Sequence, residues 1–269
     1  MMASDSSSSS STTPVKRLGI TVLSDPAKEK GVVADVCFVH GLGGHPYETW
    51  LWSPGIFKQG VQWLWPSSSA KTECYWPLDL VARDFGNVRV LTYGYTSHPT
   101  GFFVKRTNMM TIEEHASKLL QTLNTERGHC RGRPIIFVAH SLGGILVQAA
   151  ILESLKYREE HSLRDLAKSC SAIIFFGTPH IGAQAADYGK VVAGVLGTIG
   201  FSFNTAVLND LKPGAKFLLS TDEDFNDLLD RRMNSEQKLQ IFSFQEGQGL
   251  SSIGYFDGKV SFNPFSCIL

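Results

Sequence analysis

Short apolar runs alternate with longer stretches of helical periodicity along most of this 269-residue chain. Residues 135–138 are wholly apolar and rich in β-branched side chains, which predicts a strand buried on both faces, as in a parallel sheet. Similar runs predict strands at 18–23, 35–39, 88–93, 172–176 and 239–244. Helical patterns predict helices at 76–85, 111–126, 145–155, 153–168 and 220–232. Because strands and helices alternate, we expect an α/β fold with a mostly parallel sheet and helices on both faces.

The pattern also predicts how the chain is divided. One domain suits this length better than two, and we place it at 15–248. The Ser/Thr-rich residues 1–14 are expected to be a disordered tail, and 249–269, which show no clear period, an irregular one. Residues 183–235 have helical periodicity but few strand signals, and their apolar, glycine-rich part is 191–203. We therefore expect a helical lid over about 183–235.

Two of the predicted helices carry N-terminal capping signals. Thr111 and Glu114 have the spacing of a capping box. Ser220 or Thr221 is expected to cap the last helix, which is acidic.

A serine stands at the junction between the central strand and the next helix. Ala139 and Gly143, two residues before and after Ser141, are small enough for a tight turn, although the first position is usually glycine. A strand, a sharp turn with serine at its apex, and a helix form the nucleophile elbow of α/β-hydrolases. His140 and Gly143 belong to the same turn. The alternative is a buried strand that ends in an ordinary turn.

A glycine-rich loop, 40–45, follows the strand at 35–39. It lacks the G-x-G-x-x-G spacing and the Lys-Ser/Thr pair of phosphate-binding loops, so we expect no nucleotide cofactor. In a hydrolase this loop would supply one oxyanion donor and the residue after the nucleophile the other. The donors would be the N–H groups of Leu42 and Leu142, with Gly41 and Gly43 shaping the loop. His40 is interpreted as a loop-positioning side chain rather than a base.

The composition excludes several classes of function. The 25 basic and 25 acidic side chains cancel, which argues against a nucleic-acid partner. The five cysteines are widely spaced and lack a C-x-x-C, so we expect reduced thiols in an intracellular protein, without a metal site. No run reaches the roughly 18 apolar residues of a membrane span, and the N-terminal tail lacks the apolar core of a secretory signal.

All five tryptophans fall between Trp50 and Trp76. They would either line an acyl pocket or belong to an insertion that packs on the sheet through its large rings. We favour the second interpretation.

Five motifs in order resemble the serine esterases of the "serine active site containing" family, which share the α/β-hydrolase fold with lipases. The residues that carry the likeness are 39–45, 76–80, 90–95, 139–144 and 176–180. The likeness extends over about 18–248. It implies hydrolysis of ester or phospholipid substrates, possible peripheral membrane contact, and association with mitochondrial or endoplasmic reticulum membranes. Similar domains also stand at the front of large fungal signalling proteins.

The catalytic triad is incomplete in the sequence. In this fold an acid and then a histidine follow the serine. Glu246, after the last predicted strand, is the candidate acid, with an exposed loop glutamate as the alternative. All eight histidines precede it. His180, after the strand at 172–176, is the candidate substitute base, although in the family this turn is structural.

Two classes of function therefore stay open. One is a serine esterase that is impaired in this chain, through a truncated gene model, an alternative splice form or a lost base. The other is a non-catalytic binding or signalling module that keeps the pocket.

Overall fold

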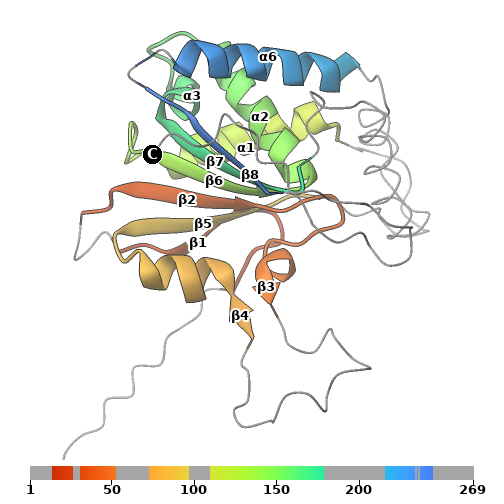
Figure 1. Cartoon of the computed structure of the whole chain (residues 1–269). Coiled ribbons are helices and arrows are strands. Elements are labelled where there is room, and N and C mark those ends of the chain that lie inside the picture. Colours follow the sequence, from red (N-terminus) through yellow and green to blue (C-terminus); the bar gives the residue numbers. More distant parts are fainter. Residues whose placement is uncertain are drawn as a thin grey trace, which may run out of the picture.

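A six-stranded sheet in the order β1-β5-β2-β6-β7-β8 forms the centre of the fold (Figure 1). The strands are β1 (Gly19–Ser24), β2 (Ala34–Val39), β5 (Val88–Gly94), β6 (Ile135–His140), β7 (Cys170–Phe176) and β8 (Gln240–Phe244). Only β1 runs antiparallel to its neighbour, β5, while the other pairings in this sheet are parallel. This arrangement confirms the predicted mostly parallel sheet, and all six strands lie within two residues of their predicted positions.

The computed structural model describes residues 14–26, 31–52, 73–96, 110–178, 216–233, 235 and 237–244. Several predictions fall outside these residues. They are the N-terminal and C-terminal tails, the lid before residue 216, and the side chains of His180 and Glu246.

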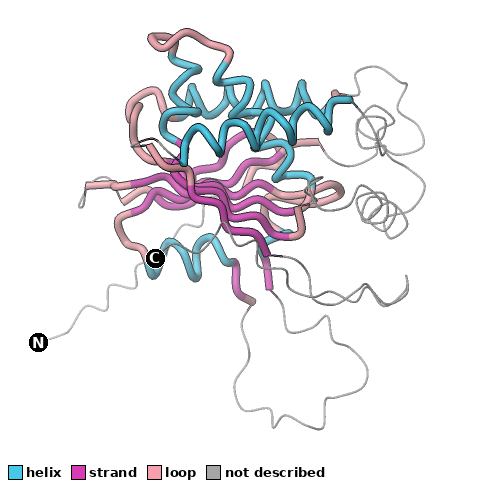
Figure 2. The backbone as a smooth tube through the Cα atoms, turned by 45° about the horizontal axis from the view of Figure 1, so that its top comes forward, coloured by secondary structure: helices cyan, strands magenta, loops and turns pink. Residues whose placement is uncertain are grey.

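Helices cover the two faces of the sheet unequally (Figure 2). One face carries α1 (Ile112–Glu126), α2 (Leu142–Leu155), α3 (Asp165–Ser169) and α6 (Lys216–Met233), with the short turn η3 (Ser162–Arg164) between α2 and α3. The other face carries the wide, π-type helix η2 (Pro77–Ala82), which packs against β5 and β1. A two-residue ribbon, β3 (Leu51–Trp52) with β4 (Cys74–Tyr75), follows η1 (Glu48–Trp50) on that side. Helices therefore lie on both faces, as predicted.

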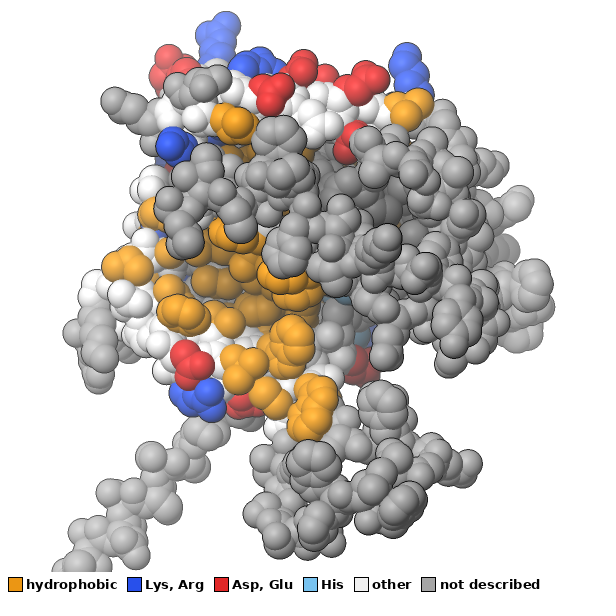
Figure 3. Space-filling model, in the orientation of Figure 1, with side chains coloured by type: hydrophobic (Ala, Val, Ile, Leu, Met, Phe, Trp, Pro, Cys, Tyr) orange, Lys and Arg blue, Asp and Glu red, His pale blue; other side chains and the backbone are white. Residues whose placement is uncertain are grey.

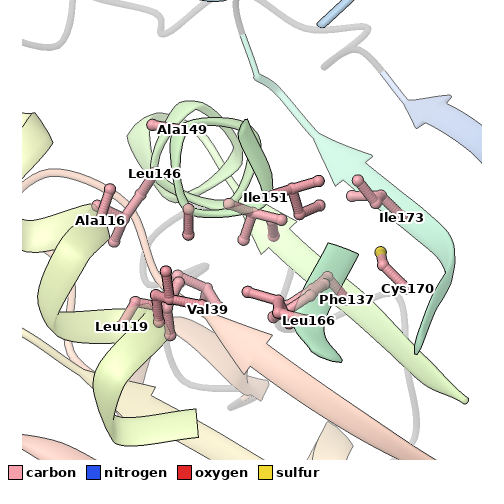
Figure 4. Packing of buried hydrophobic residues seen from close by; sticks show 14 of the residues in the cluster. Val39, Ala116, Leu119, Phe137, Leu146, Ala149, Ile151, Leu166, Cys170 and Ile173 are labelled. Atoms are coloured by element: carbon pink, nitrogen blue, oxygen red, sulfur yellow. The ribbon is translucent and has the colours of Figure 1, made fainter. Parts of the chain in front are cut away.

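The larger hydrophobic core lies between the sheet and the four α-helices (Figure 4). Val39 and Phe137 point from the strands toward Leu119 of α1 and Leu146 and Ile151 of α2. A smaller core on the other face gathers Phe38, Val90 and Val138 around Trp50. The two cores explain why β2 is buried along its whole length.

Two helix predictions need correction, and one capping prediction is confirmed. The helix expected at 153–168 is broken, since α2 ends at Leu155 and only η3 and α3 follow. The last helix begins at Lys216, so neither Ser220 nor Thr221 caps it, and Thr221 is instead buried inside it. The capping box of α1 is confirmed: Thr111 Oγ1 accepts the N–H of Glu114 and the Glu114 carboxylate accepts the N–H of Thr111.

A buried ion cluster ties the amino ends of the parallel strands together. Asp35 of β2 is fully buried and accepts hydrogen bonds from Arg89 of β5 at 2.9 Å, from Arg133 at 3.1 Å and from Arg127. Arg89 and Arg127 are also nearly inaccessible to solvent. The cluster lies at the edge of the sheet opposite to Ser141, which follows the carboxyl end of β6.

Candidate functional site

Ser141 stands at a strained turn between β6 and α2. Its φ of 51° and ψ of −124° make it the only non-glycine residue with positive φ in the described part of the chain. Its N–H donates to the carbonyl of Phe176 at 2.8 Å, and its carbonyl accepts the N–H of Gly144 at 3.0 Å and the hydroxyl of Thr178 at 3.1 Å. Strain of this kind persists only where the surroundings fix it, and it occurs at nucleophile elbows.

The glycines after the elbow allow α2 to approach the ends of the strands. A Cβ atom on Gly143 would clash with the carbonyl oxygen of His40 and would lie 2.6 Å from that of Val39. A Cβ atom on Gly144 would clash with the side chain of Thr178. Larger residues at these positions would push the amino end of α2 away from β2 and β7.

The loop after β2 lies against the elbow. A Cβ atom on Gly41 would stand 2.8 Å from Cβ of Ser141, so the two backbones are in contact. The carbonyl of Gly41 is held by two groups, Nδ1 of His40 at 2.9 Å and the N–H of Gly44 at 3.1 Å. The same peptide unit carries the N–H of Leu42, which in a trans peptide faces away from that carbonyl. The orientation of this candidate oxyanion donor is therefore fixed.

His40 is buried in one neutral tautomer. The N–H of Tyr95 donates to Nε2 at 3.3 Å, while Nδ1 bonds the Gly41 carbonyl, which can only accept. Nδ1 therefore carries the proton. Tyr95 stacks on the imidazole at 4.4 Å and donates its hydroxyl to the His40 carbonyl at 3.0 Å. Because burial raises the pKa of Tyr95, its phenol stays protonated and keeps this bond. The geometry supports a positioning role for His40.

Two other described histidines, His140 and His115, lie near this edge and pack against aromatic rings. Among the described residues, Oγ of Ser141 has no hydrogen-bond partner. The ring of His140 meets the edge of Trp50 at 6.5 Å. The ring of His115 packs against Tyr95 at 5.2 Å, and burial lowers the pKa of His115, which favours its neutral form.

Of the three tryptophans that the structure describes, one is buried against the sheet and two are partly exposed. Trp50 is buried and meets Phe38 edge-to-face at 5.1 Å. Trp52 and Trp76 are 47% and 38% exposed. The described residues contain no cluster of His, Cys, Asp and Glu side chains that could hold a metal ion, and no helix among them is long and apolar enough to span a membrane.

Comparison with known proteins identifies the family. Residues 105–246, more than half of the chain, match the family described as "Putative serine esterase (DUF676)". The chain belongs to this family. The elbow and the parallel sheet of this DUF676 protein are those of the α/β-hydrolase fold, as expected from the sequence, and its function is therefore hydrolase-like.

The chain is also similar to curated proteins and solved structures. It is 28% identical to Protein SERAC1 of Danio rerio over 218 residues and 24% identical to Protein SERAC1 of Homo sapiens over 216 residues. Each alignment covers 80% of this chain and 30% of the relative, so the chain spans about 30% of the length of these relatives. The lipase BlEst2 of Bacillus licheniformis in its mature form is 18% identical, with a TM-score of 0.44 over 88% of this chain and 71% of the lipase. Phospholipase PlaB of Legionella pneumophila in complex with thio-NAD is 17% identical, with a TM-score of 0.42 over 79% of this chain and 37% of the phospholipase.

Some residues that build the site in this DUF676 protein were missed by sequence reasoning. Thr178 was noted only as part of a motif, yet its hydroxyl holds the Ser141 carbonyl. Tyr95 likewise belongs to a motif, at 90–95, for which the sequence indicated no role, although its N–H and its hydroxyl both donate to His40. Neither contact leaves a local signal, because each joins residues that are 37 or more positions apart.

Proposed function

We propose that this protein is a carboxylic ester hydrolase that acts on lipid esters through an acyl-enzyme intermediate, with Ser141 as the nucleophile. The observation that carries the proposal is the strained backbone of Ser141, at φ 51°, against which the Gly41 loop is packed. This arrangement presents a serine beside backbone N–H groups at the carboxyl edge of a parallel sheet. A buried strand that merely ended in a turn would not need such strain.

The chemistry follows from the geometry. Oγ of Ser141 attacks the ester carbonyl and loses its proton to a base, and the N–H groups of Leu42 and Leu142 bind the developing oxyanion. Leu142 is the first residue of α2, so the partial positive charge of the helix terminus adds to this stabilisation. The base gives this proton to the leaving alkoxide, which departs as the alcohol. Water then attacks the acyl-serine and loses a proton to the base, and Oγ of Ser141 leaves with that proton as the carboxylic acid is released.

The candidate base and acid follow strands that end at the site. Thr178, whose hydroxyl reaches the Ser141 carbonyl, is two residues before His180. Phe244, the last residue of β8, is two residues before Glu246, and its carbonyl accepts an N–H from the residue after β7. His180 stays the candidate substitute base and Glu246 the candidate acid, and we expect this pair to work less well than a complete triad. The order serine, histidine, acid differs from the usual order of this fold.

This departure leads us to expect slow turnover. Loss of the triad base from a serine hydrolase costs on the order of 10⁶ in kcat, and the oxyanion hole and binding retain about 10³ to 10⁴ over water. Within the 269 residues of this sequence no histidine follows Glu246, so we expect this chain by itself to hydrolyse simple esters weakly.

Hydrolysis of p-nitrophenyl esters with short and long acyl chains tests the proposal. We expect the unaltered chain to release nitrophenol slowly. Ser141→Ala should abolish this release, and His180→Ala should make it slower still. His161→Ala, which changes an exposed histidine between α2 and η3, is the control and should leave the rate unchanged. A rate that survives Ser141→Ala would contradict the assignment of the nucleophile.

The second candidate function is a non-catalytic binding or signalling module, which the resemblance to domains at the front of fungal signalling proteins suggests. Such a module would bind a lipid or ester without consuming it. It predicts saturable binding of a non-hydrolysable ether analogue by both the unaltered chain and Ser141→Ala, with no turnover in either. Turnover that depends on Ser141 would exclude it.

The family resemblance also suggests the setting. We propose a phospholipid substrate and peripheral contact with mitochondrial or endoplasmic reticulum membranes. Fractionation of cells that express the chain would test this, and recovery in neither membrane fraction would contradict it.

A further inference from the structure

One part of the sheet is apolar, and none of the described helices lies over it. On the face opposite to α2, η2 packs against β5, β1 and β4. Six side chains, one from the residue before η2 and five from the strands β6, β7 and β8, form what we call the open face. They are Trp76, Ile136, Ile174, Phe176, Phe242 and Phe244. In Figure 3 hydrophobic side chains gather into a patch below α6 on this side of the molecule.

The aromatic side chains of the open face pack against each other but remain accessible to solvent. Phe176 stacks on Phe244 with ring centroids 5.2 Å apart and meets Trp76 edge-to-face at 6.2 Å. Phe244 is 49% exposed, Trp76 38% and Phe242 37%. One face of a sheet is expected to be covered by another layer, and a continuous aromatic surface of this kind marks a site of interaction.

We propose that the open face is the docking surface for the last 25 residues of this sequence, 245–269. The first argument is connection, because β8 ends at Phe244, which is itself part of the open face. The second is reach. Twenty-five residues extend to about 80 Å, whereas β6, β7 and β8 together span roughly 10 Å across the sheet.

Composition supplies the third argument. The segment has only three charged residues, at 246, 257 and 259. Nine of its side chains are large and apolar: Leu250, Ile253, Tyr255, Phe256, Val260, Phe262, Phe265, Ile268 and Leu269. An anionic lipid surface is less suited to the open face, because β6, β7, β8 and η2 contain no Lys or Arg that would attract it.

Trypsin offers a direct test in the full chain, because Lys259 is the only Lys or Arg between residues 239 and 269. If the segment is docked, cleavage after Lys259 is at least about tenfold slower than in a free peptide of residues 245–269, since the protease acts on the open form. Phe244→Asp or Phe242→Asp should restore the fast rate. Leu219→Asp on α6, where the side chain is 39% exposed, is the matched control and should not.

Hydrogen exchange tests the same proposal without any variant, so it still applies if a substituted chain fails to fold. In the unaltered chain, amides of residues 250–265 should exchange more slowly than in the free peptide. Cleavage or exchange at the peptide's rate in the unaltered chain would overturn the proposal. Protection that appears only as protein concentration rises would instead assign the open face to a second copy, and protection only with phosphatidylcholine vesicles would assign it to a lipid surface. Either result would also overturn the proposal that residues 245–269 dock there.

Discussion

The strained backbone of Ser141 depends on the close packing that the following glycines allow. A backbone conformation such as that of Ser141 costs on the order of 1–3 kcal/mol, which neighbouring contacts must offset. Gly143 makes those contacts possible by bringing α2 against the carbonyl groups at the end of β2.

Replacement of Gly143 separates helix propensity from packing. In a helix, Gly→Ala is normally stabilising by about 1 kcal/mol. Here the added methyl group would meet two backbone carbonyl oxygens that cannot turn away, so we expect Gly143→Ala to lower the free energy of unfolding by about 1–3 kcal/mol. Urea denaturation measures this difference.

Gly128→Ala is the matched control. Its Cβ atom would find ordinary contact at 3.4 Å, and its φ is not positive. It should leave stability unchanged or raise it slightly. Equal effects of the two substitutions would contradict the close approach of α2 to β2.

His115 links stability to pH. Burial, and secondarily the charge of Lys118, lower the pKa of His115 in the folded state. Between that pKa and the ordinary value of about 6.5 the unfolded chain binds more protons, so stability is fully present above pH 6.5 and falls as the pH is lowered.

We therefore expect the stability of His115→Phe to depend less on pH below pH 6.5 than that of the unaltered chain. The phenyl ring keeps the packing on Tyr95 but cannot bind a proton. Thermal unfolding from pH 7.5 to 5 should show a smaller loss of stability in the variant than in the unaltered chain. Identical slopes would show that His115 is not buried as a neutral ring.

At the scale of elements, the sequence predicted strands better than helices. The strands β2, β6 and β7 are short apolar runs, and burial on both faces makes such runs recognisable. The helix α2 was expected to be amphipathic, but its first ten residues are all buried, because α1, α3 and α6 surround it. The charged stretch after it was predicted as one helix, whereas local contacts such as Ser154 Oγ to the Leu163 carbonyl fold it into a compact turn.

The ion cluster at Asp35 joins β2, β5 and the end of α1 into one unit. Asp35→Asn would keep the volume but remove the buried carboxylate that Arg89 and Arg127 share. Among the described residues, each guanidinium group would keep only one longer ion pair, Arg89 with Glu126 at 3.4 Å and Arg127 with Asp165 at 3.5 Å. Breaking a buried ion pair from one side costs about 3–5 kcal/mol, and we expect a loss of that size in urea denaturation.

Asp84→Asn provides the comparison. Asp84 pairs with Arg83 at 2.7 Å, but both side chains are more than half exposed, so solvent screens the pair. Its replacement should barely change the unfolding curve. If Asp35→Asn were as mild, the cluster would not hold the strands together.

At the scale of the whole molecule, the fold and half of the site follow from the sequence. The elbow and the glycine-rich loop are local motifs, and parallel strands bring their carboxyl ends to one edge, so the meeting of Ser141 with Gly41 could be expected. The two hydrogen bonds that hold His40 could not be predicted, because they come from Tyr95, which is 55 residues away. The base and the acid stay predictions, since His180 and Glu246 lie beyond the described residues.

The central claim, that Ser141 is the nucleophile of an esterase site, is tested most directly by a fluorophosphonate probe. Such a probe forms a covalent bond with an activated serine, and mass spectrometry of the tryptic peptides locates it. We expect slow labelling of this chain on Ser141 alone, and none in Ser141→Ala. Strong labelling that vanishes in both Ser141→Ala and His180→Ala would show a fully active base at His180 and contradict the expected slow turnover. Labelling on another serine, or labelling that persists in Ser141→Ala, would contradict the account itself.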